Sequence, residues 1–319
     1  MSVVADIATY DCRGAFAEEL RRLAREDDRI VAVCNDSVGS SNLVGFGEEF
    51  PDRLVNVGIA EQDLVGVSAG LANAGRIPFV CAAAPFLTGR ATEQIKADIA
   101  YSNVHVVLCG QSPGMAYGQL GPTHHSIEDL SWMRAIANLD VVVPADPEQT
   151  MAAVRWAASA RRPVYIRVPR FKVPAVTPEG APLVRGEATI LRDGDDITVV
   201  TIGTLVSRAL LAADVLGGEG ISVRVVNMPF VSPLDETLLL AAASETRGIV
   251  TAEEATVAGG LGAAVASLLA QRRPMPMRLL GVPNVFAPTG DADFLLDHFG
   301  LNVEGIIAAV RELHADAVH

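Results

Sequence analysis

The 319-residue chain is short of basic residues, cysteine, aromatic residues and long apolar runs, and each shortage excludes a class of protein. Lys and Arg together number 25 against 38 Asp and Glu, so the formal net charge is −13. This balance argues against nucleic acid as a partner, because phosphate backbones are bound by basic surfaces. A phosphorylated small substrate remains compatible with it, since such a molecule needs only a few local arginines.

The cysteines give neither a disulfide framework nor a metal site. The four of them, Cys12, Cys34, Cys81 and Cys109, are widely spaced and include no C-x-x-C pair, which fits a reduced compartment. No apolar run reaches the ~18 residues of a membrane span. The first residues, MSVVADIATYDCRG, carry acids where a signal peptide carries a basic segment. We therefore expect a cytoplasmic protein without a membrane partner.

The residues that are abundant predict an α/β fold. Half of the chain is hydrophobic and only 5% is aromatic, so its core is mainly aliphatic, as in parallel strands covered by helices on both faces. Strand-like and helix-like segments alternate in both halves. Strand-like runs lie at 29–34, 53–59, 77–84, 104–110 and 163–168, and again at ITVVTIGT, ISVRVVNM, RGIVTAEE and MRLLGV. The pattern predicts two doubly wound domains with mainly parallel sheets.

A proline-rich stretch divides the two series. Residues 169–188 carry several prolines and little periodicity, which is typical of a linker. We place the first domain at 1–172, the linker at 173–188 and the second domain at 189–319, sizes that are ordinary for domains.

The most distinctive short segment is Gly58-Ile59-Ala60-Glu61-Gln62, at a strand-to-helix junction. An acid there lies at the carboxyl edge of a parallel sheet, where α/β proteins bind ligands. By itself, however, the segment favours the plainer interpretation that Glu61 is a first-turn acid stabilised by the helix dipole.

A second segment, the Gly/Pro-rich loop 118–125 (GQLGPTHH), holds two adjacent histidines. They are either a functional pair or a solvated surface, and they lack the Cys or carboxylate neighbours of a zinc site. Arg170 ends a strand-like run and Arg13 opens the first helix, positions from which arginines can clamp phosphate, although most surface arginines bind nothing. No serine stands in a G-x-S-x-G elbow, so a hydrolase nucleophile is not expected.

Taken in order, the segments of this chain resemble a known enzyme family. FPDRLVNVGIAEQDLVGVSAGLA, GPTHHSIEDLSWMRAIANLDVVVPADPEQT, PVYIRVPR and EEATVAGGLG are similar to the carboxyl-terminal two-thirds of transketolase and of 1-deoxyxylulose-5-phosphate synthase. The resemblance is greatest to split transketolases, in which this region is a separate subunit. It implies a pyrimidine-binding domain for thiamine diphosphate followed by a transketolase C-terminal domain.

The resemblance also implies roles for individual residues. Glu61 would hydrogen-bond the pyrimidine ring and activate the cofactor, since a carboxyl group in a largely apolar cleft tends to keep a proton that it can share. Phe86 would pack on the ring and Ile59 would belong to the same cofactor site. His124 would face the substrate, either as a hydrogen-bonding group or as a proton-transfer group. The substrate would also contact Arg170, Arg13 and Gln119.

The expected reaction is transfer of a two-carbon ketol unit from a ketose, phosphorylated in the usual case, to an aldehyde in carbohydrate metabolism. Two departures from the family pattern stand out. Gln119 and Leu120 replace an acidic pair before GPTH whose aspartate reads a substrate hydroxyl, and Leu120 cannot accept that hydrogen bond. Ala255 stands where a histidine is common. These departures imply a site re-shaped for another ketose or acceptor.

The sequence also lacks the G-D-G motif that holds the diphosphate through Mg²⁺ or Ca²⁺ in complete enzymes of this family. The resemblance therefore implies an amino-terminal, diphosphate-binding partner subunit in an α2β2 heterotetramer. The alternatives are the β subunit of a 2-oxo-acid dehydrogenase, a synthase that joins pyruvate to an aldehyde, and a non-catalytic scaffold partner that keeps the fold.

Overall fold

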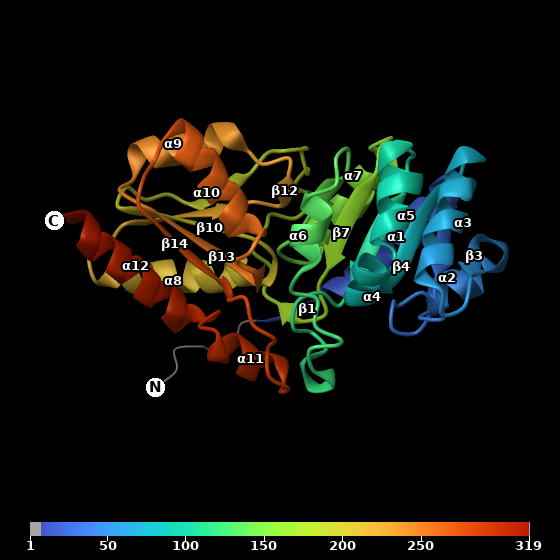
Figure 1. Ribbon diagram of the computed structural model, residues 1–319, viewed down its shortest axis with the longest axis horizontal. Helices are drawn as coiled ribbons and strands as arrows, with labels where there is room; N and C mark the ends of the chain where they lie inside the picture. Colours follow the sequence, from blue (N-terminus) through green and yellow to red (C-terminus); the bar gives the residue numbers. More distant parts are fainter. Residues whose placement is uncertain (1–7, 319) are drawn as a thin grey trace.

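A computed structural model describes residues 8–318 of the chain (Figure 1). Two α/β units lie side by side along the longest axis, with the first half of the chain on the right of Figure 1 and most of the second half on the left. The expected fold class, α/β with mainly parallel sheets, is confirmed.

The first sheet has seven strands. Their spatial order is β12 (Phe230–Ser232), β6 (Asp140–Val142), β7 (Val164–Val168), β5 (Val107–Gln111), β4 (Ile77–Ala83), β2 (Ile30–Cys34) and β3 (Leu54–Asn56). All neighbours are parallel except β12, which runs antiparallel to β6. β12 comes from the second half of the chain, so the two halves share this sheet.

Helices cover both faces of the first sheet because the side chains of its strands alternate between two apolar cores. One face packs against α1 (Cys12–Glu26), α2 (Val44–Glu49) and α7 (Pro147–Ser159). The other packs against α3 (Glu61–Asn73), α4 (Ala84–Arg90), the π-helix η2 (Ile95–Tyr101) and α6 (Asp129–Arg134). Short turns of helix complete this half: η1 (Pro51–Arg53), α5 (Thr92–Gln94) and η3 (Gly118–Leu120).

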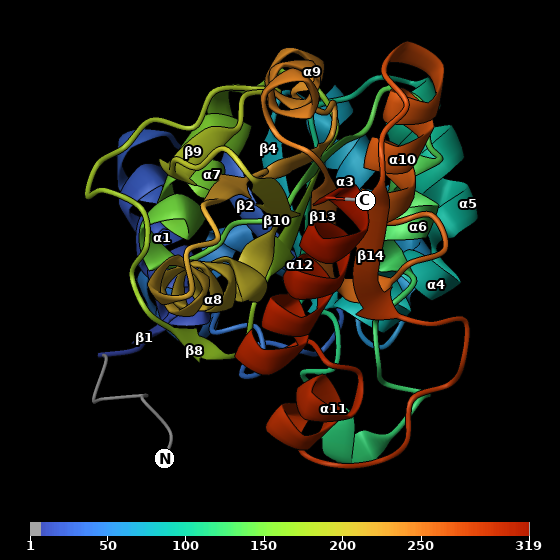
Figure 2. The same cartoon turned by 90° about the vertical axis from the view of Figure 1, so that its left-hand side faces the viewer.

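The second sheet has five strands, in the order β14 (Met277–Val282), β13 (Ile249–Thr256), β10 (Ile197–Thr201), β11 (Val223–Asn227) and β9 (Thr189–Arg192). Only β9 is antiparallel to its neighbour. Figures 1 and 2 show α9 (Glu236–Glu245) and α10 (Leu261–Arg272) on one face, with α8 (Val206–Gly218) and α12 (Val303–Val318) on the other. The remaining elements are η4 (Gly203–Leu205), α11 (Ala292–His298) and the two-stranded pair β1 (Tyr10–Asp11) and β8 (Lys172–Val173).

The core is continuous between the two sheets. Val141 and Val143 in and beside β6 belong to the same cluster of buried residues as Val200 of β10 and Val226 of β11. The two units therefore support each other across a dry apolar contact. No helix within residues 8–318 combines the length and apolarity needed to cross a membrane.

Candidate functional site

Glu61 is the first residue of α3 and lies just beyond the carboxyl end of β3. Its side chain is only 4% exposed. Its Oε1 atom accepts a hydrogen bond from Asn35 Nδ2 at 2.8 Å and another from Arg90 Nη1 at 2.9 Å. The carboxylate is thus held by side chains that follow β2 and end α4, rather than by the amides of its own helix. That geometry fits a ligand site better than a simple first-turn acid.

Arg90 and Phe86 lie one turn apart on α4, and their side chains meet. The guanidinium carbon of Arg90 lies 4.1 Å from the centre of the Phe86 ring. The other neighbour of that ring is His124, which meets it edge-on with the ring centres 5.1 Å apart. A line of contacts therefore runs from the Glu61 carboxylate through Arg90 and Phe86 to His124.

The same line continues to Arg170. The Tyr117 ring lies 6.2 Å from the His124 ring, and the Arg170 guanidinium carbon lies 5.2 Å from the centre of the Tyr117 ring. The sequence placed Phe86, His124 and Arg170 in one site on resemblance alone. In the structure they lie along one continuous set of side chains at the carboxyl edge of the first sheet.

Arg13 connects to Glu61 through a different set of side chains. It is the second residue of α1, and its Nη1 atom donates to the Ser40 carbonyl at 3.3 Å. The Ser40 hydroxyl donates to the Ser37 carbonyl, and the Ser37 hydroxyl donates to Asn35 Oδ1 at 2.8 Å. A short polar loop therefore joins the arginine to the amide that holds Glu61.

The adjacent histidines have different environments. His124 is half-buried, and its Nδ1 atom lies 3.0 Å from the Thr123 hydroxyl. His125 is buried, with Nε2 3.3 Å from the Gly118 carbonyl. Burial lowers the pKa of His125, so a neutral ring donates that hydrogen bond and secures the loop. Only His124 faces Phe86, which separates the two alternatives that the sequence left open.

Three residues on which the sequence analysis focused point toward solvent. Ile59 is 77% exposed and Leu120 is 57% exposed. Gln119 is exposed on η3, next to Leu120. These side chains flank the line of contacts and do not form part of it, so their roles stay predictions.

Sequence reasoning missed Asn35, Arg90 and Tyr117. Asn35 follows a buried strand at the same sheet edge as Glu61, which was a usable signal. Arg90 stands four residues after Phe86, a spacing at which side chains meet only if the segment is helical. Their presence changes one expectation, because the cleft around Glu61 holds an amide and a guanidinium and is not largely apolar.

The arrangement accommodates a planar group with hydrogen-bonding atoms on its edge. The Glu61 carboxylate offers an acceptor and the Phe86 ring offers a face, and the planar Arg90 guanidinium contacts both. An aminopyrimidine ring is planar and has the same kind of edge. The residues present therefore fit the pyrimidine half of thiamine diphosphate.

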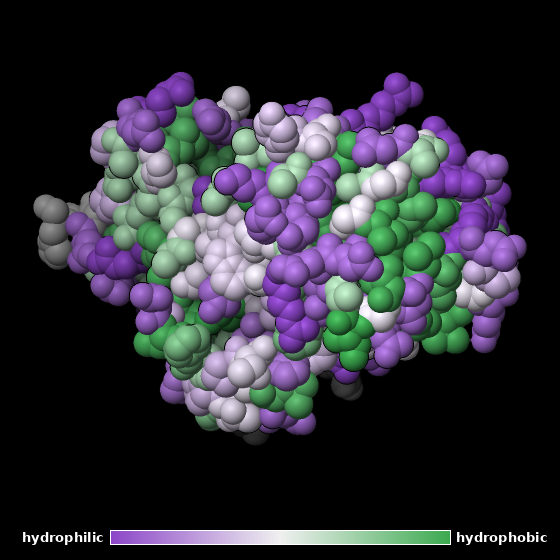
Figure 3. All heavy atoms as spheres, turned by 45° about the vertical axis from the view of Figure 1, so that its right-hand side comes forward, coloured by the Kyte–Doolittle hydropathy of each residue, from purple (hydrophilic) through white to green (hydrophobic). Residues whose placement is uncertain are grey.

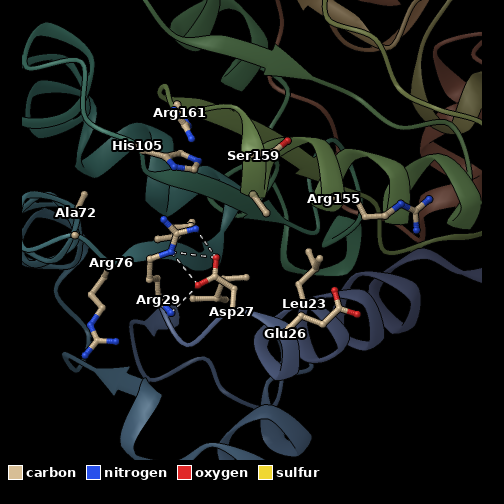
Figure 4. Close-up of a pocket in the computed structure, with 14 residues that line it drawn as sticks. Leu23, Glu26, Asp27, Arg29, Ala72, Arg76, His105, Arg155, Ser159 and Arg161 are labelled. Atoms are coloured by element: carbon tan, nitrogen blue, oxygen red, sulfur yellow. Dashed lines mark hydrogen bonds and ion pairs between the residues drawn. The ribbon is translucent and has the colours of Figure 1, made fainter.

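The largest cavity, about 540 Å³, lies at the other edge of the sheet (Figure 4). Arg29 and Arg76, which immediately precede β2 and β4, line it together with His105. Figure 4 shows Arg29 bonded to Asp27 and Arg76 turned away. The ends of α1 and α7 also reach this cavity, and the carbonyl ends of helices favour cations, which explains the arginines without a ligand.

An apolar surface covers part of the first unit (Figure 3). Tyr101 is 86% exposed and Trp132 is 40% exposed. Both line a groove of about 520 Å³ together with Ile136. An exposed patch of large apolar residues marks a contact surface more often than free solvent-facing surface.

Known proteins resemble this chain over nearly its whole length. Residues 8–175 match the family model of the transketolase pyrimidine-binding domain, and residues 186–306 match that of the transketolase C-terminal domain. One of the two kinds of subunit of the apulose-4-phosphate transketolase of Phocaeicola vulgatus is 41% identical over 302 residues, covering 94% of this chain and 96% of that protein.

Two further similarities point the same way. The 6-deoxy-6-sulfo-D-fructose transketolase subunit SqwH of a Clostridium species is 38% identical, with 94% of each chain covered. A solved structure of a split-gene transketolase, in an inactive β4 tetramer, is 40% identical with a TM-score of 0.89. That similarity covers 96% of this chain and 98% of the other.

Proposed function

Because the chain belongs to the transketolase family and carries its pyrimidine-binding and C-terminal domains, we propose that it is the carboxyl-terminal subunit of a split, thiamine diphosphate-dependent transketolase. In this proposal the assembled enzyme transfers a two-carbon ketol unit from a ketose to an aldehyde. The observation that carries it is the buried Glu61 carboxylate beside the Phe86 face, a fit for the pyrimidine ring.

The chain's own residues would position and activate the cofactor. Thiamine diphosphate, when bound, supplies the nucleophilic carbon that takes up the ketol unit. Glu61 would hold a proton at the ring nitrogen it faces, and Asn35 would fix the carboxylate that shares this proton. Phe86 would cover one face of the ring, and Ile59 would border the site.

The substrate would lie along the rest of the line. His124, edge-on to Phe86 and with Nδ1 near Thr123, is placed to hydrogen-bond a carbonyl or hydroxyl of the substrate and to move its proton. Arg170 and Arg13 would bind an anionic group, with Gln119 at the entrance. The names of two relatives specify a phosphate-bearing and a sulfonate-bearing sugar, which supports a substrate with one anionic end.

Leu120 would narrow the choice of donor. Its side chain is exposed at the loop tip and offers no acceptor to a substrate hydroxyl. We infer that the donor lacks a hydroxyl that must be read at this point, or that another subunit reads it.

The enzyme would need a partner. We propose that an amino-terminal subunit holds the diphosphate through Mg²⁺ or Ca²⁺, in an α2β2 assembly with this chain. The apolar surface around Tyr101 and Trp132 supports a contact with another chain on the unit that contains Glu61. The domain limits 1–172 and 189–319, with a linker at 173–188, and a cytoplasmic location stay predictions.

The proposal is tested by substrate class in the purified complex. Transfer of a two-carbon unit from a ketose phosphate or sulfonate to an aldehyde would support it. Decarboxylation of pyruvate with acyl transfer to a lipoyl group would instead show the β subunit of a 2-oxo-acid dehydrogenase. A complex that binds the cofactor and has neither activity would favour a scaffold role.

A further inference from the structure

Arg90 has a position that the proposed reaction does not require. It is the last residue of α4, and its side chain is 51% exposed. Its interactions converge inward nevertheless: Nη1 donates to Glu61 Oε1 at 2.9 Å, and the guanidinium carbon lies 4.1 Å from the Phe86 ring centre. A solvent-exposed arginine has many free conformations, so this one is selected by two contacts made together.

Those two contacts are the two that a pyrimidine ring would make. The ring would present a nitrogen to the Glu61 carboxylate and a face to Phe86. A guanidinium is likewise planar, with N–H donors on its edge and a face that stacks on aromatic rings. The same face of Phe86 cannot be covered by both groups at once.

Resting on the function proposed above, we propose that Arg90 is an internal occupant of the pyrimidine position, which fills the site before the cofactor binds and must leave when it does. Glu61 is its only ion-pair partner within residues 8–318, so no other salt bridge holds it in place. Displacement exchanges a cation for the cofactor's neutral ring beside the carboxylate. It frees the guanidinium at the edge of the site, four residues from Phe86.

The effect on affinity follows from the fraction of molecules in which the site is open. A ligand that binds only the open state has an apparent Kd raised by the inverse of that fraction. A half-exposed ion pair and one cation–π contact are modest interactions, so we expect Arg90 to raise the apparent Kd by about 3- to 30-fold.

The test uses the assembled complex of this chain with its diphosphate-binding partner. Thiamine diphosphate with Mg²⁺ is titrated calorimetrically into the wild-type complex, the Arg90→Ala complex and an Arg90→Lys complex. Lys96→Ala is the matched control, because Lys96 is an exposed cation on the neighbouring helix η2. Removal of an exposed side chain with one partner preserves the fold, which circular dichroism and recovery of the complex would verify.

We expect Arg90→Ala to lower the Kd for the cofactor by about 3- to 30-fold and to speed its association. Arg90→Lys should fall between, since an ammonium keeps the charge and loses the planar stack. Lys96→Ala should match wild type. An unchanged or higher Kd in Arg90→Ala would overturn the role of Arg90 and leave the proposed function standing. A wild-type complex that binds no cofactor would overturn both.

Discussion

At the scale of single residues, the carboxyl group of Glu61 carries the proposed chemistry, and a single-atom change isolates it. Glu61→Gln keeps the size of the side chain and an oxygen for Asn35 but removes the shared proton. We expect ketol transfer by the complex to fall by about 10²- to 10⁴-fold, the range for a lost proton-transfer group. Initial rates at saturating cofactor measure it.

The matched control for this change is Asp63→Asn. Asp63 lies in the same first turn of α3, and its side chain is exposed. It loses a charge equally near the helix start, so a general electrostatic effect would slow both variants. Equal rates for Glu61→Gln and wild type would exclude the carboxyl group from the reaction.

The two histidines give a second prediction because their contacts differ. His124→Asn should lower kcat/KM by about 10²-fold while the free energy of unfolding changes little, since the ring is half-buried and faces the proposed substrate path. His125→Asn should instead lower the free energy of unfolding by about 1 kcal/mol, because the buried bond to the Gly118 carbonyl is lost. The reverse pattern in steady-state kinetics and urea unfolding would contradict this assignment.

At the scale of elements, helix α10 shows a cap that comes from another strand. Gly260 precedes the helix and has no side chain with which to cap it. Glu253 of β13 accepts instead from the amides of Leu261 at 2.7 Å and Gly262 at 2.8 Å. Burial raises the pKa of Glu253 to about 7, above its ordinary value of 4.5. The folded chain therefore binds this proton more tightly than the unfolded chain.

This pKa predicts a loss of stability toward neutral pH. The contribution is fully present below about pH 4.5 and is lost as pH rises through about 7, a change of about 3 kcal/mol at ~1.4 kcal/mol per pH unit. Urea unfolding at pH 5 and pH 8 should show this fall in wild type, and Glu253→Gln should lack it. The same pH dependence in both proteins would show that another group is responsible.

Most elements that position the site were predictable from the sequence, and the exceptions have physical reasons. Helices α1, α3 and α7 and the buried strands β2, β4, β5 and β7 follow clear periodic or continuous apolar patterns. Helix α4 did not, because APFLTGR is one short piece with a proline at its start and a glycine near its end. Phe86 was therefore placed by resemblance, and its neighbour Arg90 was overlooked.

At the scale of the whole molecule, β12 and a buried arginine join the two halves. The three residues of β12 are too few to reveal by pattern that they pair with β6, far away in the sequence. Arg167 of β7 bonds Asp129 of α6 at 3.0 Å and the Glu254 carbonyl of β13 at 2.8 Å. The Arg167 side chain is 4% exposed, so it forms a buried ionic link between the two sheets.

Breaking this link should destabilise the chain as a unit. Arg167→Met leaves Asp129 as a buried charge without its partner, and we expect the free energy of unfolding to fall by about 3–5 kcal/mol. Arg76→Met, at an exposed position, serves as control and should change it by less than about 0.5 kcal/mol. A small effect of Arg167→Met in denaturant titration would mean that the apolar contact alone holds the halves together.

The division of the cofactor between two subunits is tested by comparing the purified chain with the complex formed on co-expression with a diphosphate-binding partner. Thiamine diphosphate binding and ketol transfer are measured for both under the same magnesium concentration. We predict that the complex binds the cofactor and transfers the two-carbon unit, and that the chain alone does neither. Equal binding and turnover by the chain alone would contradict the split-enzyme account.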